Sequence, residues 1–256
     1  MKFFETHAHY DFRQFDADRD ELLSKTLPEF GISHLINIGT DINSSRTNIR
    51  LAKKYPYIYA AVGFHPHDTK SMTDDDLLEL KELAGDEKVI AIGEIGLDFH
   101  YDHSPRDIQK KRFLQQLELA REVRLPVMIH SRESDAEVFK ILKDSGIGPE
   151  LGGIIHCYSG SIELAMKYID MGFHIGIGGI VTYNNARELQ EAVRQLPIER
   201  LVLETDCPFL SPAPKRGGRN DSTNLLHIAE KIAQLRNTTT EKIAELTNIN
   251  AQKLFL

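Results

Sequence analysis

Short apolar runs of strand character alternate with longer amphipathic stretches along the whole chain. The runs are rich in β-branched and aromatic residues, which is typical of strands buried on both faces. The expected strands are 3–7, 35–39, 58–63, 89–94, 127–130, 153–156, 174–177 and 201–204. The stretches between them carry apolar residues at helical spacing, as Phe113, Leu117 and Ala120 do. The expected helices are 18–30, 43–54, 74–83, 107–123, 135–144, 162–171 and 186–195.

Two further helices are expected after the last strand. One covers 222–236, and the other begins near Thr238, where Thr238 and Glu241 match the Thr-x-x-Glu pattern of a capping box. Eight strands alternating with helices predict an α/β fold of the single (β/α)8 TIM-type barrel class, with residues 1–256 as one domain. An open, doubly wound sheet is the alternative, but no Gly-x-Gly-x-x-Gly motif opens a helix after the first strand.

Six polar residues close or directly follow five of the expected strands. They are His7, His9, Glu94, His130, His156 and Asp206. Because the carboxyl ends of parallel strands meet at one rim of a barrel, these side chains are expected to converge. Four imidazoles and two carboxylates form the ligand set of a centre with two divalent cations. A set without thiolate suits Zn, Mn, Ni, Co or Fe, and is less typical of Mg alone.

Each of these residues also has a simpler interpretation when it is taken alone. His7 and His9 share one face of an extended strand, so both can reach one ion, yet either could be an unrelated solvated histidine. Glu94 follows an apolar run and has two oxygens that could bridge two ions, or it could form a salt bridge. Asp206 could bind an ion and accept a proton from its water, or cap a turn. His130 and His156 could be hydrogen-bonded core histidines.

Composition narrows the class of protein. The chain has 256 residues and a net charge of −7. Its 41% hydrophobic and 27% charged residues are ordinary fractions for a globular domain. A protein that grips duplex nucleic acid through phosphates usually has a basic face, so any such contact here must be local. Two cysteines in so long a chain do not indicate a disulfide framework. We find no signal peptide and no run that could span a membrane, so we expect a cytoplasmic protein without an obligate protein partner.

Cationic and imidazole side chains near the expected rim could bind an anionic substrate. His65 ends the third strand region, and Arg132 follows His130 by two residues; Arg132 could also pair with Glu133. A loop after Asp206 carries three cations around a glycine pair, namely Lys215, Arg216 and Arg219. Arginine matches phosphate oxygens bidentately, although a solvated basic loop is the simpler interpretation.

Ordered blocks of sequence resemble the TatD family of metal-dependent deoxyribonucleases, within the amidohydrolase-like barrels. The resemblance covers nearly the whole chain and rests on motifs that include Thr-His-Ala-His (6–9), Gly-Phe-His-Pro-His (63–67), Gly-Glu-Ile-Gly-Leu-Asp (93–98), Ile-His-Ser-Arg (129–132), His-Cys-Tyr-Ser-Gly (156–160) and Glu-Thr-Asp-Cys-Pro (204–208). It implies a barrel that hydrolyses phosphodiester bonds in DNA with one or two divalent ions. By the family pattern, one ion is held by His7, His9, Glu94 and Asp206. The other is held by Glu94, His130 and His156, with Glu94 bridging.

Three positions depart from the family pattern. Glu5 stands where Asp is usual, Tyr158 replaces a frequent Phe, and Asn184 stands where a Lys is common. Tyr158 is counted among the expected substrate-binding residues. If the usual Lys holds phosphate, Asn184 alters affinity or substrate choice.

Three functions are compatible with these observations. The favoured hypothesis is a metal-dependent hydrolase that cleaves DNA through metal-activated water, with Asp206 and Glu94 as its catalytic residues. The second is an amidohydrolase-type enzyme that cleaves amide or ester bonds of a small molecule, since one fold hosts many chemistries. The third is a non-catalytic barrel that keeps metal for structure, which the absence of thiolate ligands disfavours.

Overall fold

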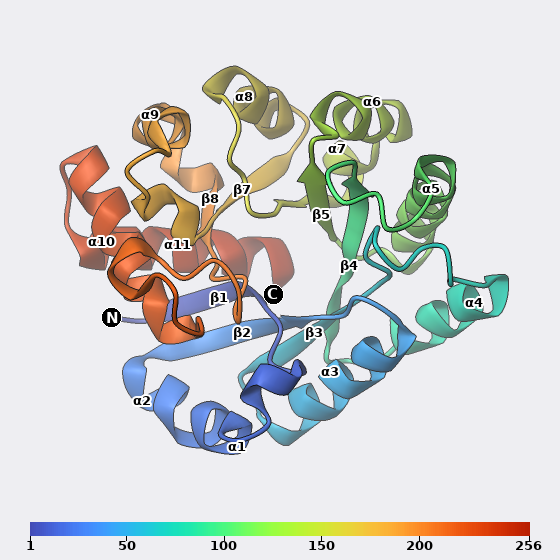
Figure 1. The fold of residues 1–256 in the computed structure, drawn as a ribbon, viewed down its shortest axis with the longest axis horizontal. Coiled ribbons are helices and arrows are strands. Elements are labelled where there is room, and N and C mark those ends of the chain that lie inside the picture. Colours follow the sequence, from blue (N-terminus) through green and yellow to red (C-terminus); the bar gives the residue numbers. More distant parts are fainter.

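Eight parallel strands follow one another around a barrel in sequence order (Figure 1). The computed structural model describes residues 1–256. The strands are β1 (Phe3–Ala8), β2 (Ile32–Ile38), β3 (Ile58–Val62), β4 (Val89–Asp98), β5 (Val127–Arg132), β6 (Gly153–Ile155), β7 (Phe173–Ile177) and β8 (Leu201–Leu203). The ring closes beside β8, where Ala8 bridges Cys207 and the backbone N–H of His9 donates to the Cys207 carbonyl at 2.8 Å. The predicted (β/α)8 barrel is confirmed, and the open sheet is excluded.

Helices lie outside the barrel, where most of them connect successive strands and the last two follow β8 (Figure 1). They are α1 (Arg19–Glu21), α2 (Leu27–Phe30), α3 (Ile42–Lys54), α4 (Asp74–Leu83), α5 (Arg106–Val123), α6 (Asp135–Ser145), α7 (Ile147–Leu151), α8 (Ile162–Asp170), α9 (Arg187–Gln195), α10 (Leu225–Arg236) and α11 (Thr240–Phe255). The predicted helix over 18–30 is divided by a π-helical segment, Leu22–Thr26. The short helix α7 was not expected.

Neighbouring residues of most strands belong to two separate apolar clusters. In β6, Ile155 joins the larger cluster against the helices, whereas Ile154 joins a smaller one with Val202 of β8. Because neighbouring strand residues point to opposite faces, the smaller cluster fills the barrel interior. Ala251 and Phe255 of α11 belong to this inner cluster, so α11 covers the end where the strands begin. The opposite end, where the strands finish, is left for polar side chains.

The structure corrects several expected boundaries, among them the start of β2, which is Ile32 instead of residue 35, and the limits of β4 and α11. β4 runs to Asp98 instead of stopping at Glu94, because its pairing with β5 continues through Gly96 opposite His130. The predicted capping box of Thr238 and Glu241 is wrong. Thr239 is the N-cap of α11, and its side chain accepts a hydrogen bond from the Lys242 N–H at 3.2 Å.

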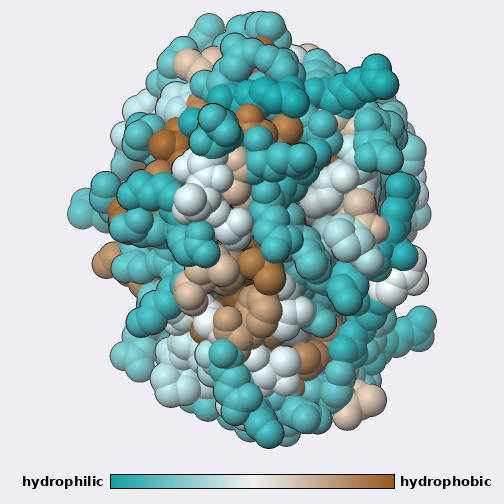
Figure 2. All heavy atoms as spheres, turned by 90° about the vertical axis from the view of Figure 1, so that its left-hand side faces the viewer, coloured by the Kyte–Doolittle hydropathy of each residue, from teal (hydrophilic) through white to brown (hydrophobic).

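The surface agrees with a charged, globular composition. Figure 2 shows one face of the molecule, which is largely hydrophilic with small scattered apolar patches. None of the helices combines the length and the apolar character needed to cross a lipid bilayer.

Candidate metal centre

All six strand-end residues meet at the carboxyl end of the barrel. Three groups have possible ligand atoms within 4.8 Å of one another: His7 with His156 and Asp206, His7 with His9 and Glu94, and His65 with Glu94 and His130. Glu94 and His130 lie within β4 and β5, His156 directly follows β6, and Asp206 lies three residues after the end of β8. The expected convergence is therefore present in the fold.

The first half of the cluster surrounds the His-x-His pair. His7 Nε2 and His9 Nε2 lie 3.2 Å apart. Glu94 Oε2 lies 3.4 Å from His7 Nε2 and 3.7 Å from His9 Nε2. Asp206 Oδ1 lies 3.3 Å from His9 Nε2 and 3.7 Å from His7 Nε2. Two imidazole nitrogens and two carboxylate oxygens facing one point form a donor set that fits a divalent cation.

The second half surrounds the other oxygen of Glu94. Glu94 Oε1 lies 2.8 Å from His130 Nδ1 and 3.5 Å from His156 Nε2. His65 Nε2 is 3.6 Å from the same oxygen. Because the two oxygens of Glu94 face different groups of histidines, this side chain can join two cations.

Three of the imidazoles have an oxygen atom close to the ring nitrogen that faces away from the centre of the cluster. His9 Nδ1 lies 3.1 Å from the Ile38 carbonyl, His130 Nε2 lies 3.2 Å from Asp98 Oδ2, and His156 Nδ1 lies 3.2 Å from Glu204 Oε1. Such outer partners fix the ring orientation and raise the basicity of a ligating histidine. Sequence reasoning assigned no role to Asp98 or Glu204. The signal that could have found Glu204 is a carboxylate within the apolar run of the last strand.

Glu5 joins the two strands that carry the first half of the cluster. It is fully buried and accepts hydrogen bonds from the backbone N–H groups of His7 at 3.2 Å and Thr205 at 2.9 Å. The Thr205 hydroxyl donates to its second oxygen at 2.6 Å. Burial raises the pKa of Glu5 to about 8, although these hydrogen bonds oppose the shift. Glu5 thus holds the His7 and Asp206 segments side by side.

The backbone is specialised where ligand-bearing segments meet. Asp206 has a φ of 56° and Cys157, next to His156, has a φ of 49°, both in the left-handed region that side chains rarely adopt. Gly96 has a φ of +146°, and a Cβ there would lie 2.0 Å from the His130 carbonyl oxygen. Only glycine fits this close approach of β4 to β5.

The charges of the cluster favour a bound cation. Burial opposes ionisation of Glu94, but the electrostatic influence of the neighbouring His65, His156 and His7 outweighs it and holds the pKa of Glu94 well below its usual value. Burial also opposes protonation of His156, yet Glu204 and Glu94 raise the pKa of His156 to about 10. Ionised carboxylates thus demand positive charge among these imidazoles, which a divalent cation would supply.

The cluster opens into a cavity of about 500 Å³. The wall includes five of the six expected ligands, all but His7, beside the aromatic residues Phe12, Tyr101 and Phe209. His65 and Arg132, two expected substrate-binding residues, line it as well. Arg132 does not pair with Glu133, which instead contacts His100 at 2.6 Å.

The four other expected substrate-binding residues do not line this cavity. Tyr158 is buried and its hydroxyl donates to the Ser161 carbonyl. Arg219 forms an ion pair with Asp18 at 2.6 Å, and the Arg216 guanidinium lies 4.5 Å from the centre of the Tyr183 ring. Lys215 is exposed in the same loop. Asn184 is also exposed and outside the cavity wall.

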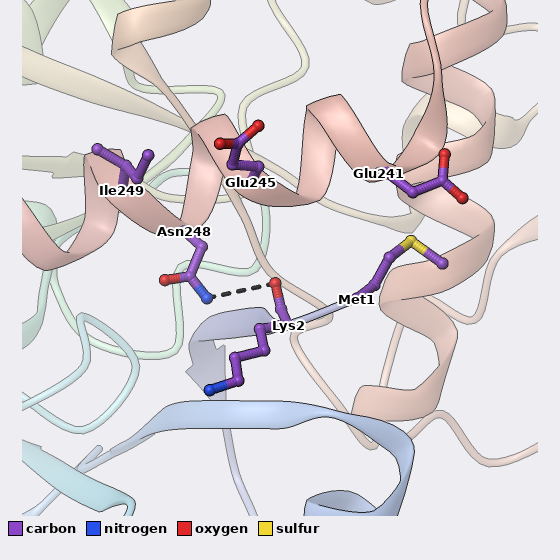
Figure 3. Close-up of a pocket in the computed structure, with 6 residues that line it drawn as sticks. All are labelled: Met1, Lys2, Glu241, Glu245, Asn248 and Ile249. Atoms are coloured by element: carbon purple, nitrogen blue, oxygen red, sulfur yellow. Dashed lines mark hydrogen bonds between the residues drawn. The ribbon is translucent and has the colours of Figure 1, made fainter.

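A second cavity, of about 410 Å³, lies near the chain's first residues and α11. Figure 3 shows its lining, where Asn248 donates a hydrogen bond to the Lys2 carbonyl at 3.3 Å. The other lining residues are Met1, Glu241, Glu245 and Ile249. It contains no histidine and none of the expected site residues, so the chemistry belongs to the strand-end cavity.

A parallel barrel that gathers imidazoles and carboxylates in this way defines a metal-dependent hydrolase. The family model for the TatD related DNases matches residues 4–256. The chain is 44% identical over 252 residues to the uncharacterized metal-dependent hydrolase YabD of Bacillus subtilis, covering 98% of both chains. It is 35% identical over 248 residues to the 3′-5′ ssDNA/RNA exonuclease TatD of Cronobacter sakazakii, covering 95% of this chain and 94% of that one.

The fold comparison agrees with the sequence comparisons. The crystal structure of YjjV, a TatD homologue from Escherichia coli K12, has a TM-score of 0.93 at 31% identity, covering 99% of this chain and 97% of that chain. The chain therefore belongs to the TatD related DNase family, as its motifs indicated.

Proposed function

We propose that this metal-dependent hydrolase cleaves phosphodiester bonds of DNA with two divalent cations held at the strand-end cluster. The observation that carries the proposal is Glu94, whose two oxygens face different groups of histidines at 2.8 to 3.7 Å. A buried carboxylate shared in this way is the arrangement of a two-cation hydrolytic centre. The relative named as a 3′-5′ exonuclease on single-stranded DNA and RNA supports a nucleic-acid substrate.

Bound cations would supply a water of lowered pKa and a positive field for the phosphodiester oxygens. The ligands would be His7, His9, Glu94 and Asp206 on one side, with Glu94, His130 and His156 on the other. Donors of this kind admit Zn, Mn, Ni, Co, Fe or Mg.

Side chains at the cavity would orient the substrate and move its proton. The Asp206 side chain is 15% exposed and faces the cavity, so it can accept a proton from an attacking water. Burial opposes ionisation of Asp206, but its contacts with His9 and His156 lower its pKa, which keeps it ready as an acceptor. Arg132 has no carboxylate within ion-pair distance and lines the cavity, so it is free to meet a phosphate oxygen.

We also propose that the protein is cytoplasmic. The thiols of Cys157 and Cys207 are both free, and free thiols persist in a reducing compartment.

Replacement of Glu94 by Gln tests the proposal. The isosteric variant keeps the side-chain volume but loses the shared negative charge, so we expect at least a roughly 100-fold loss of cleavage. The measurement combines metal content of the purified protein with digestion of labelled single-stranded DNA, with Mn²⁺ or Mg²⁺ and with a chelator. Glu122→Gln is the control, because this exposed residue pairs only with Lys81 at the surface.

Full DNA cleavage by Glu94→Gln would overturn the mechanism. If the unaltered enzyme left DNA intact but opened lactones or cyclic amides in a parallel screen, the amidohydrolase alternative would replace the nuclease. No lysine lines the cavity that could take the bridging place of Glu94, which favours the phosphodiesterase.

A further inference from the structure

Exposed aromatic side chains occur only at the metal centre. The chain has 12 Phe and 8 Tyr, and among these only Tyr101, at 50%, and Phe209, at 44%, are exposed. Both line the 500 Å³ cavity. An aromatic ring exposed to water lacks the free energy gained by burying it. Because both exposed rings lie at the same cavity, we expect a bound ligand to cover them.

The two rings lie on opposite sides of the cluster. Tyr101 follows β4, and Phe209 follows β8. In a closed ring of eight strands ordered β1 to β8, these two strands lie across the barrel from each other. A phosphodiester held at Glu94 and Asp206 would therefore have one ring towards each of its two flanking nucleotides.

Phe209 is held firmly although much of its ring is exposed. The backbone N–H of Phe209 donates to the Asp206 carbonyl at 2.9 Å, and Asn220 Nδ2 donates to the Phe209 carbonyl at 2.6 Å. The rings of Phe12 and His9 contact it edge-on, with centroids 5.6 Å and 6.5 Å away. Such a ring needs little further ordering when a ligand stacks on it.

Tyr101 is tied to the other half of the centre. Its backbone N–H donates to Asp98 Oδ1 at 2.8 Å, and the second oxygen of Asp98 contacts His130. The Arg132 guanidinium lies 4.6 Å from the centre of the Tyr101 ring, and the His103 ring is parallel to it within 7°. Aromatic and guanidinium planes side by side provide a stacking surface next to a positive charge.

Flat rings beside a phosphodiester site recognise nucleobases through stacking. A paired base within a duplex is covered on both faces by its neighbours, whereas an unpaired base offers a free face of any sequence. Resting on the proposed function, we propose that Phe209 and Tyr101 stack on the bases that flank the scissile phosphodiester. Stacking of this kind requires unpaired bases, which agrees with the relative named as a 3′-5′ exonuclease on single-stranded DNA and RNA.

The test compares two substrates with Phe209→Ala and Tyr101→Ala enzymes. One is a single-stranded DNA oligomer, and the other is an oligomer of equal length whose nucleotides all lack bases. Loss of one stacked base is expected to lower the ratio of kcat/KM for DNA to kcat/KM for the abasic oligomer by about 5- to 150-fold. Phe209→Tyr should keep the ratio, because it keeps the ring. Leu114→Ala is the control, since Leu114 is 50% exposed on α5 and outside the cavity.

The outcomes separate this proposal from the proposed function. A ratio unchanged in both alanine variants, in an enzyme that cleaves DNA, would overturn the stacking proposal and leave the nuclease intact. Equal losses on both substrates would also overturn it, because a merely structural role affects both alike. If the unaltered enzyme with metal cleaved neither oligomer, the proposed function itself would fail, and the stacking proposal with it.

Discussion

Glu204 contacts a histidine of the metal centre, His156, without belonging to the expected ligands. The side chain is fully buried in the barrel, with Oε1 3.2 Å from His156 Nδ1 and 2.5 Å from the Cys157 N–H. A carboxylate in this position fixes which nitrogen of the imidazole faces the cation. Its influence on the metal therefore passes through His156.

Replacement of Glu204 by Gln should weaken metal binding, while the glutamine side chain still fills the same space inside the barrel. We expect affinity for Mn²⁺ or Zn²⁺ to fall by about 10- to 100-fold, because the ring loses its charged partner. Isothermal titration of the metal-free protein measures this directly. Glu230→Gln is a matched control, since Glu230 faces His227 at 3.1 Å on the surface. Unchanged affinity would show that Glu204 only fills space.

Residues of the centre could be predicted where position alone decides their role. His130 and His156 each end an apolar run, and the fold brings the ends of parallel strands together, so sequence was enough to group them. Phe209 and Tyr101 escaped prediction because an aromatic residue in a loop is usually buried. Arg219 was expected near the substrate, but nothing local in the sequence indicates its ion pair with Asp18, some 200 residues away.

At the scale of elements, α11 covers the end of the barrel that lies opposite the metal centre. Asn250 in this helix is 5% exposed, and its Nδ2 donates to the carbonyls of Ile198 at 2.7 Å and Leu201 at 2.8 Å. Leu201 is the first residue of β8. The helix is thus fastened to the strand whose other end leads to Asp206.

Replacement of Asn250 by Ala should destabilise the fold more than its size suggests. Two buried carbonyl groups lose their donor, which costs about 1 to 3 kcal/mol in free energy of unfolding. Urea denaturation followed by circular dichroism measures this cost. Lys253→Ala on the exposed side of the same helix should change stability by less than about 0.5 kcal/mol. Equal stabilities of the two variants would contradict the role assigned to Asn250.

Elements were easier to predict than their limits. The strands were found because each is a continuous apolar run, as expected when helices cover one face and the barrel interior the other. The end of β4 was predicted wrongly because the charged residue Glu94 interrupts the apolar run, although the pairing with β5 continues to Asp98. The start of α11 was wrong by one residue because Thr238 and Thr239 both match a cap, and only the backbone distinguishes them.

For the whole molecule, the barrel separates a charged end from an apolar interior, and one histidine departs from this division. His174 lies in β7, paired with Ile154, only 8% exposed, and its Nδ1 has no hydrogen-bond partner. Burial, assisted by the positive charge of Arg200, lowers the pKa of His174 to about 4. The folded protein therefore keeps this imidazole neutral at a pH where the unfolded chain protonates it.

The sign of the effect on stability follows from proton binding. Between its ordinary pKa of about 6.5 and its folded pKa of about 4, His174 binds a proton only in the unfolded chain, so stability falls as pH falls through this range. The loss should reach roughly 1 to 3 kcal/mol by pH 4. His174→Gln cannot titrate, so its free energy of unfolding should decline less steeply from pH 7 to pH 4.5, as urea titrations at several pH values would show. The histidines of the metal centre contribute equally to both proteins and cancel in the difference between their slopes. A slope for His174→Gln equal to that of the unaltered protein would refute the assignment.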